Sequence, residues 1–387
     1  MRQLKRTWAE INLDNLEYNY KLIRALLSPG TKFMAVVKAD AYGHGSAPIA
    51  QTLERCGADW FGVSNINEAI ALRKAGITKK ILILGHTPVE NVRQLFDFDI
   101  TQTLLDFDYG QRLAQAAEQA GVVVDAHIKL DTGMTRIGFQ VGTAEDIITD
   151  IARLYYLPSL KITGIFTHFA AADEPGSIGR EFTKAQHRRF MSVCDELREN
   201  AYNLDIHCCN SAATLIYPEY HHDMVRPGII LYGQSPNGRP IKNFPIRPVM
   251  TLKTVVSLVK TVREGEKISY GCTYETKGEM RVATVPVGYA DGYPRALSNR
   301  GKASVNGKLV PIVGRVCMDQ MMLDVSGVDV SEGDTVTLFE GESSIGVDDI
   351  ASLANTINYE ILCGISRRVQ RVYIKNNRIS EVVDYTM

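Results

Sequence analysis

A lysine follows directly after a run of apolar residues near the N-terminus. The run Phe33–Val37 is typical of a strand buried on both faces, Lys38 ends it, and Tyr42 and His44 follow in a glycine-containing turn. A buried ammonium group destabilises a fold unless it has a partner or takes part in chemistry. Lys38 is therefore a candidate reactive group, although a lysine that reaches solvent from a strand end is the more common arrangement.

Polar side chains also follow four later apolar segments. They are, in chain order, Lys129 and Arg136, then His168, then Asn210 and Ser211, and finally Arg226 and Gly228. If the segments are strands of a β/α barrel, these residues lie at the carboxyl ends of the strands, where such barrels place their active sites. The last two loops of such barrels commonly hold a phosphate. We therefore predict a phosphorylated cofactor near a reactive lysine.

The elements that would position these residues alternate between short apolar segments and amphipathic ones. Strands are predicted at 32–37, 60–63, 81–84, 101–104, 122–130, 160–166, 205–208 and 224–226. Helical patterns separate them, for example at 143–157 and 181–200. Eight parallel strands with intervening helices indicate a closed (β/α)8 barrel, and a doubly wound open sheet is the alternative.

The pattern changes at a proline-rich connector, 234–248. Beyond it, strands are predicted at 251–262, 281–287, 309–316, 321–325, 335–339 and 368–374, with one short helix at 346–358. The predicted fold class is α/β, with an N-terminal (β/α)8 TIM-like barrel over 1–240 and a C-terminal mainly-β domain over 241–387.

Composition excludes several classes of protein. The chain has 387 residues, 45% of them hydrophobic and 22% charged, with a net charge of −1, which favours neither nucleic acid nor an anionic membrane as a partner. It contains no apolar run of the roughly 20 residues that a membrane span needs and no signal-peptide core. Its seven cysteines form no CxxC pair. We therefore expect reduced thiols and a cytoplasmic protein.

Two histidine-containing groups are candidate metal ligands. They are His207 with Cys208 and Cys209, and the doublet His221 and His222. No second pair stands at ligand spacing from either group, so buried thiols and a polar loop are the simpler interpretation. No metal site is expected.

Several motifs resemble those of alanine racemases, and they occur in the same order. They are AVVKADAYGHG at 35–45, KLDTGM at 129–134, THFA at 167–170, NSAA at 210–213, RPGI at 226–229, SYG at 269–271, VGYADGYPR at 287–295, GRVCMDQ at 314–320 and the pair Tyr359 and Glu360. The resemblance covers most of the chain.

This resemblance implies pyridoxal 5′-phosphate bound as a Schiff base to Lys38, and interconversion of L- and D-alanine that supplies D-alanine for peptidoglycan. Racemisation needs an acid or base on each face of the α-carbon. The resemblance assigns the D-enantiomer's proton to Lys38 and the L-enantiomer's to Tyr270 of the partner subunit. It thus implies a homodimer with shared active sites, each made from one subunit's barrel and the other's β domain.

The resemblance also implies roles for other residues. Those expected to bind the cofactor, besides Lys38, are Tyr42, Leu84, His168, Asn210, Ser211, Arg226, Gly228, Ile229 and Tyr359. Those expected around the substrate are Arg136, Tyr289, Cys317, Met318 and Asp319. Arg226 is placed against the pyridine nitrogen. Lys129 matches a lysine that is carbamylated in many relatives, which would make it an anion orienting Arg136.

Three alternatives remain open at this stage. A serine or broad-specificity racemase of the same family shares the motifs. A decarboxylase with the same cofactor usually places a carboxylate against the pyridine nitrogen, and Arg226 speaks against it. A simple carrier of the cofactor would leave Tyr270 and the β domain unexplained.

Overall fold

The computed structural model describes residues 6–141, 144–239 and 244–386, and the chain divides into two compact units. The barrel unit consists of residues 19–41 and 46–231. The β-rich unit consists of the described residues from 232 onward, those of 1–18 and the segment Tyr42–Gly45. This division differs from the predicted domains at the N-terminus, while the predicted boundary at 240/241 lies outside the described residues.

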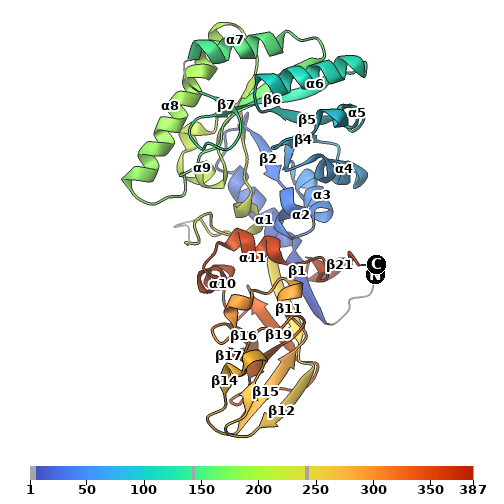
Figure 1. Ribbon diagram of the computed structural model, residues 1–387, viewed down its shortest axis with the longest axis vertical. Helices are drawn as coiled ribbons and strands as arrows, with labels where there is room; N and C mark the ends of the chain where they lie inside the picture. Colours follow the sequence, from blue (N-terminus) through green and yellow to red (C-terminus); the bar gives the residue numbers. More distant parts are fainter. Residues whose placement is uncertain (1–5, 142–143, 240–243, 387) are drawn as a thin grey trace. The chain divides into compact units, whose positions relative to one another are not determined.

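The barrel unit is built on parallel strands in the order β10-β2-β3-β4-β5-β6-β8-β9. Figure 1 labels β2, β4, β5 and β6 among them. Their bounds are β2 Lys32–Val36, β3 Trp60–Val63, β4 Lys80–Ile83, β5 Ile100–Leu104, β6 Val124–Asp131, β8 Leu160–Phe166, β9 Asp205–His207 and β10 Met224–Val225. The short β7 (Phe139–Gln140) pairs with β6. The amide of Arg226 donates to the carbonyl of Cys209 across 2.9 Å, so β9 and β10 adjoin and nearly close the barrel. The predicted barrel is confirmed.

Helices cover the outside of these strands, and apolar side chains fill the inside. The helices are α1 Leu13–Arg24, α3 Ser46–Cys56, α4 Ile66–Lys74, α5 Val92–Asp97, α6 Phe107–Gln119, α7 Ala144–Tyr155, α8 Ser177–Glu199 and α9 Ser211–Ile216. The predicted start of α7 at Thr143 lies outside the described residues. Five buried side chains from five different strands pack together within the barrel: Met34, Trp60, Leu82, Phe166 and Met224. Such interior packing makes the barrel a solid core whose chemistry is confined to its ends.

The β-rich unit contains a mostly antiparallel sheet in the order β12-β15-β18-β17-β16-β19-β11-β1-β20-β21. Their bounds are β1 Thr7–Asn12, β11 Met250–Val255, β12 Leu258–Val262, β15 Met280–Val285, β16 Lys302–Val305, β17 Lys308–Val313, β18 Met321–Asp324, β19 Thr335–Phe339, β20 Gln370–Lys375 and β21 Arg378–Val383. A two-stranded sheet pairs β13 (Lys267–Ile268) with β14 (Tyr274–Glu275). The predicted mainly-β architecture is confirmed.

Three features of this unit differ from the predicted elements. The strand β1 was not predicted, and it pairs with β11 and β20. The predicted strand 251–262 consists of two strands, because its two halves have different partners. The first half, β11, pairs with β19, and the second half, β12, pairs with β15. The predicted helix 346–358 is α10 (Val347–Ala354) followed by α11 (Asn358–Gly364), because Asn355 takes a left-handed conformation that ends α10.

A fully buried arginine ties the segment Tyr42–Gly45 to β20. Arg371 is 1% exposed and donates through Nε to the carbonyl of Gly43 at 2.9 Å. Its other nitrogens donate to the carbonyls of Ile365, Ser366 and Val369. The hydroxyl of Tyr373 donates to the carbonyl of His44 at 2.9 Å. The β sheet thus fixes the backbone on both sides of the glycine turn.

Replacing Arg371 by leucine is expected to lower the free energy of unfolding by about 3 kcal/mol or more, because buried carbonyls lose their donors together. Urea unfolding of the variant measures this change. Arg378→Leu, on the exposed face of β21, is the control and is expected to stay within about 0.5 kcal/mol of the unchanged protein. Equal losses in the two variants would contradict the role given to Arg371.

Within the described residues, none of the helices combines the length and the apolar character that crossing a bilayer requires.

Candidate active site

The segment after β2 is a left-handed turn that begins at Lys38. Ala39, Asp40, Ala41 and Tyr42 have φ between 52° and 54°. For residues with a Cβ atom this conformation costs about 1 kcal/mol or more each. The surrounding contacts must hold it in place, and strain of this kind collects at functional sites.

Two carboxylates hold this turn. Glu68 of α4 accepts from the amide of Ala39 at 2.9 Å through one oxygen and from the amide of Ser64 at 2.7 Å through the other. Asp40 accepts from the amide of Ser46 at 2.8 Å, which joins the turn to the start of α3. The half-buried Lys38 therefore leaves the end of β2 from a fixed backbone.

Two buried basic side chains lie over the ring of Phe166, the last residue of β8. The Lys129 ammonium lies 5.5 Å and the Arg226 guanidinium 5.2 Å from the centre of its ring. Lys129 is 3% exposed and donates to the carbonyl of Leu130 at 2.7 Å. Burial, and next the charge of Arg226, lowers the pKa of Lys129 to about 7. A large fraction of Lys129 is therefore a neutral amine near pH 7.

Arg226 heads a chain of buried hydrogen bonds that sets the protonation of two histidines. It donates from one terminal nitrogen to Nδ1 of His207 at 2.9 Å, and Nε2 of His207 lies 3.0 Å from Nδ1 of His127. A guanidinium only donates, so Nδ1 of His207 must accept, and His207 must donate through Nε2. Burial lowers the pKa of both histidines, that of His127 to about 3. Both rings are neutral.

The other contacts of Arg226 are carbonyls. Its second terminal nitrogen donates to the carbonyls of Thr167 at 2.7 Å and Cys208 at 3.1 Å. No described residue accepts from its Nε or offers it a carboxylate, although the residue is only 4% exposed. Burial lowers the pKa of Arg226 to about 10, so it remains a cation at neutral pH. A fixed buried cation whose Nε–H has no acceptor among the described residues suits a ligand with a ring nitrogen.

The predicted residues at the strand ends share one electrostatic environment. Burial lowers the pKa of His168 well below its usual range, and the charges of Arg226, Arg136, Lys129 and Lys38 lower it further. The structure therefore brings these five predicted residues together at one end of the barrel. Four basic side chains around a neutral histidine favour anionic ligands such as phosphate and carboxylate.

The loop after β6 is organised by Asp131. Its carboxylate accepts from the amides of Gly133 at 3.0 Å, Thr135 at 3.0 Å and Arg136 at 3.1 Å. These amides hold the pKa of Asp131 below its usual range although burial opposes them. The exposed side chain of Arg136 thus extends from a loop whose backbone is fixed.

The predicted phosphate-binding residues of the last two loops also meet. The amide of Gly228 donates to the hydroxyl of Ser211 at 2.8 Å, and Ile229 beside it is fully buried. Asn210 uses its side chain as the N-cap of α9, accepting from the amide of Ala213 at 3.0 Å. Leu84, after β4, packs against the barrel core. The Ser211 hydroxyl thus accepts from Gly228 and keeps its own O–H as a donor.

Within the β-rich unit, the predicted cofactor residues Tyr42 and Tyr359 form an aromatic cluster. The ring of Tyr42 lies 4.9 Å from that of Tyr232 and 6.0 Å from that of Tyr359. Burial raises the pKa of Tyr42, so its hydroxyl stays protonated and can donate a hydrogen bond. The two predicted tyrosines therefore lie together.

The remaining predicted residues meet elsewhere in the β-rich unit. The amide of Tyr289 donates to the carbonyl of Cys317 at 3.0 Å. The thiol of Cys317 lies 3.4 Å from the hydroxyl of Ser269, the residue before Tyr270. Asp319 forms an ion pair with Arg368 at 2.8 Å. The residue before the predicted second base thus contacts one of the predicted substrate residues.

Three large side chains of this group face solvent: Tyr270 is 70%, Met318 52% and Tyr289 43% exposed. Exposed apolar and aromatic groups that gather in one place are typical of a binding surface.

Some residues of the site were not assigned from sequence. His207 was weighed only as a metal ligand, yet it accepts from Arg226. Glu68 and Asp131 were not singled out, although each carboxylate fixes several amides of a site loop. The signal available for His207 was its position at a strand end, whereas nothing local distinguishes Glu68 from an ordinary helix residue.

The family comparisons agree over the length of the chain. Residues 11–236 match the family model described as alanine racemase, N-terminal domain, and residues 249–373 match the model of the C-terminal domain. Alanine racemase 1 of Clostridium acetobutylicum is 43% identical over 390 residues, which cover 99% of each chain. The alanine racemase of Desulforamulus reducens is 43% identical over 95% of this chain and 98% of its own.

Solved structures give the same result. The alanine racemase of Clostridium difficile superposes with a TM-score of 0.95 at 40% identity, covering all of both chains. That of Bacillus anthracis, solved with bound L-Ala-P, has a TM-score of 0.93 at 35% identity, covering 100% of this chain and 99% of its own. Full-length agreement in sequence and fold leaves one assignment: this chain belongs to the alanine racemase family.

Proposed function

We propose that this chain is an alanine racemase that interconverts L- and D-alanine with pyridoxal 5′-phosphate bound at Lys38. The observation that carries the proposal is the barrel end where the charges of a buried Arg226, Arg136 and Lys38 all act on a buried His168. The alternative decarboxylase would need a carboxylate against the cofactor's ring nitrogen, and no described carboxylate pairs with Arg226. A serine or broad-specificity racemase stays the second candidate because it shares these groups. A role in peptidoglycan synthesis stays a prediction.

The residues present fit the cofactor. Its phosphate would accept from the hydroxyl of Ser211, which itself accepts from the amide of Gly228, and its ring nitrogen would accept from Nε of Arg226, which lacks an acceptor among the described residues. The cofactor supplies an electrophilic carbonyl carbon for amines and a ring that withdraws electrons from the substrate's α-carbon. Because Arg226 is a cation that holds its proton, it can donate to the ring nitrogen without protonating it.

The chain's own groups supply the proton transfers. Lys38 would take or return the α-proton on the D face, and Tyr270 of the partner subunit would serve the L face. Two supports for the shared site are the exposure of Tyr270 and its link, through Ser269 and Cys317, to Tyr289 and Met318. Arg136 would bind the substrate carboxylate, since its side chain is exposed on a fixed loop.

The direct test measures both directions of the reaction. Enzyme carrying the cofactor is expected to convert L-alanine to D-alanine and the reverse, monitored by circular dichroism, and to act more slowly on serine. Equal or greater activity on serine would favour the broad-specificity alternative. Absence of turnover with a bound cofactor would refute the proposed function.

Asp131 provides a test of the loop that carries Arg136. Asp131→Ala removes the acceptor of three amides, so we expect kcat/KM for alanine to fall about tenfold, mainly through KM. Asp125→Ala is the matched control: this residue lies near the opposite end of β6 and pairs with Lys80 at 3.0 Å. The measurement is the steady-state kinetics of both variants. Equal KM values for Asp131→Ala and Asp125→Ala would show that the Asp131 contacts do not position Arg136.

Lys129 is proposed to be carbamylated. Its pKa of about 7 leaves a neutral, nucleophilic amine at neutral pH, and the resulting anion would face the cation of Arg136. Enzyme equilibrated with ¹³C-labelled bicarbonate is expected to show a carbamate carbon resonance that disappears in Lys129→Ala. At low pH the amine of Lys129 is protonated and cannot be carbamylated, so activity is expected to fall. Activity is expected to return when the enzyme is brought back above pH 7 in the presence of bicarbonate. Absence of this resonance would show that Lys129 remains an unmodified amine.

A further inference from the structure

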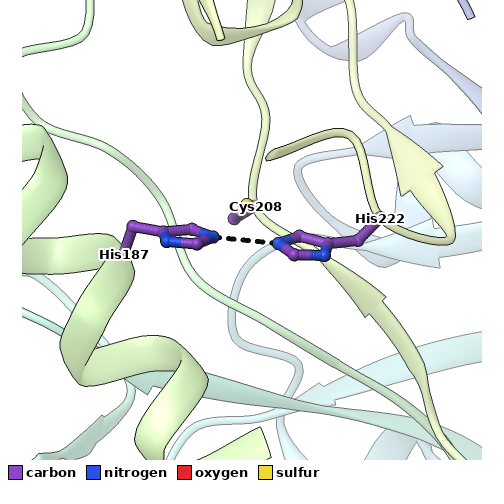
Figure 2. Close-up of side chains that lie close together, drawn as sticks. All are labelled: His187, Cys208 and His222. Atoms are coloured by element: carbon purple, nitrogen blue, oxygen red, sulfur yellow. Dashed lines mark hydrogen bonds between the residues drawn. The ribbon is translucent and has the colours of Figure 1, made fainter. Parts of the chain in front are cut away.

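A second cluster of ligand-type side chains lies apart from the strand-end cations. It consists of His187 in the middle of α8, Cys208 just after β9, and His222 just before β10. Figure 2 shows the two imidazole rings edge to edge, with Cys208 beside the gap between them. The ligand atoms of the three residues all lie within 4.8 Å of one another. The sequence placed Cys208 and His222 in two separate candidate groups and did not single out His187, because the three residues are too far apart in the chain to show ligand spacing.

The distances are close to those of a metal centre. Nε2 of His187 lies 3.0 Å from Nε2 of His222. In a tetrahedral zinc site, bonds of about 2.0–2.1 Å to nitrogen and 2.3 Å to sulfur separate neighbouring ligand atoms by roughly 3.3–3.6 Å. The two nitrogens therefore need to part by a few tenths of an ångström, and the sulfur needs to approach by at most about 1.3 Å.

Packing already directs both rings. The ring of His187 stacks on Tyr220 at a centroid distance of 3.6 Å and lies nearly coplanar with that of His222, at an angle of 7°. His222 has a φ of 46°, a left-handed conformation that is uncommon for residues other than glycine. Its neighbour His221 points elsewhere, with Nε2 at 2.9 Å from the carbonyl of Thr214. The doublet therefore offers one ligand and not two.

The ligands are in a suitable state. Burial lowers the pKa of His187 to about 4 and also lowers that of His222, so both rings carry lone pairs at neutral pH. Both rings are half-buried, whereas Cys208 is fully buried. An ion can thus enter from the histidine side, and a water can complete four ligands.

We propose that His187, Cys208 and His222 form a binding site for a borderline-soft divalent cation, with Zn²⁺ as its probe. Binding replaces the S–H bond of Cys208 by a Zn–S bond, and the thiol proton leaves to solvent. The hydrogen between the two Nε2 atoms is also displaced, because both nitrogens become ligands, and that ring keeps its proton on Nδ1 through exchange with solvent.

One cost opposes binding. Burial raises the pKa of the Cys208 thiol, which donates to the carbonyl of Tyr220 at 3.2 Å and gives up this bond when it is deprotonated. A coordinated Zn²⁺ deprotonates thiols outright, and the bond to the ion replaces the one lost.

The site would join three parts of the barrel and reach the strand end that holds Arg226. Cys208 accepts from Arg226 through its backbone carbonyl at 3.1 Å, while its sulfur faces the two histidines. An ion on that sulfur would fix α8 and the chain before β10 to the same residue. We therefore expect Zn²⁺ to raise the temperature of thermal unfolding of the enzyme, and a chelator to reverse the rise.

The test uses the enzyme with its cofactor bound, dialysed against Zn²⁺ and assayed for metal content. We expect one Zn²⁺ per chain and an X-ray absorption spectrum of the zinc with one sulfur and two imidazole ligands. His187→Ala and Cys208→Ser are each expected to weaken binding by roughly tenfold or more. The matched controls are His221→Ala and Cys209→Ser. Cys209 donates to the same carbonyl of Tyr220, at 3.1 Å, yet lies outside the cluster, so binding should persist.

A zinc shell without sulfur would overturn the proposal on the unsubstituted enzyme alone, whether or not a variant folds. Absence of bound Zn²⁺, or equal binding in all four variants, would overturn it as well. None of these readouts depends on racemase activity, so failure here leaves the proposed function standing.

Discussion

Replacing Tyr270 by phenylalanine is expected to lower racemisation of alanine by about 10²–10⁴-fold while exchange of one enantiomer's α-proton continues. The substitution removes the phenolic hydroxyl and keeps the ring, so it deletes the acid/base group of the L face alone. Lys38 remains and can still remove the α-proton of D-alanine and return a proton to the same face. D-Alanine in D₂O should therefore gain deuterium without inverting.

Proton NMR and chiral chromatography of the same reaction separate exchange from inversion. Tyr274→Phe is the matched control, because Tyr274 lies four residues along the chain and packs against the apolar cluster of Val262, Ile268, Val282 and Val313. That variant is expected to racemise alanine normally. Undiminished racemisation by Tyr270→Phe would exclude the phenol as a base. Exchange of L-alanine's α-proton in this variant would show that Lys38 serves both faces.

The barrel strands were predictable because each strand has a pattern that is visible within its own residues. A parallel strand covered on both faces reads as a continuous apolar run, and β3 and β8 were placed to the residue. The strand β1 was missed because its place depends on β11 and β20, which lie more than two hundred residues further along the chain. The break between β11 and β12 was missed because Val255 and Val256 continue the apolar pattern while the hydrogen-bond partners change.

The strand-end residues of the barrel were predictable for a topological reason. Parallel strands bring their carboxyl ends to one edge, so Lys38, Lys129, His168 and Arg226 could be grouped before any distance was known. The electrostatic environment of these residues could not be predicted from the sequence. The pKa of Lys129 depends on burial and on the charge of Arg226, both of which are tertiary properties.

Contacts across the barrel interior are the features that the sequence predicts least well. His127 is on β6 and His207 is on β9, with β8 between them, yet their rings meet at 3.0 Å. The same holds for the left-handed turn after Lys38. Gly43 and Gly45 predict a turn, but the residue types of Ala39 and Ala41 do not predict a left-handed conformation. That conformation depends on Glu68 and Asp40, whose carboxylates accept hydrogen bonds from backbone amides.

Mixing two inactive variants is expected to restore activity if each active site is built from two chains. Lys38→Ala and Tyr270→Phe each lose racemisation as homodimers. A mixed dimer holds one doubly defective site and one intact site, made from the barrel with Lys38 and the other chain's Tyr270. With random pairing at equal amounts, half of the dimers are mixed, so about a quarter of the full activity should return.

Co-expression of the two variants with different affinity tags, followed by tandem purification, isolates the mixed dimer, whose activity should be about half that of the unsubstituted enzyme. The control pairs Lys38→Ala with a Lys38→Ala, Tyr270→Phe double variant, which leaves no intact site in any dimer. Restoration is expected because Tyr270, Tyr289 and Met318 are 70%, 43% and 52% exposed, so a second chain can cover them. An inactive mixed dimer would place both bases on one chain, and the exposed group would then need another partner.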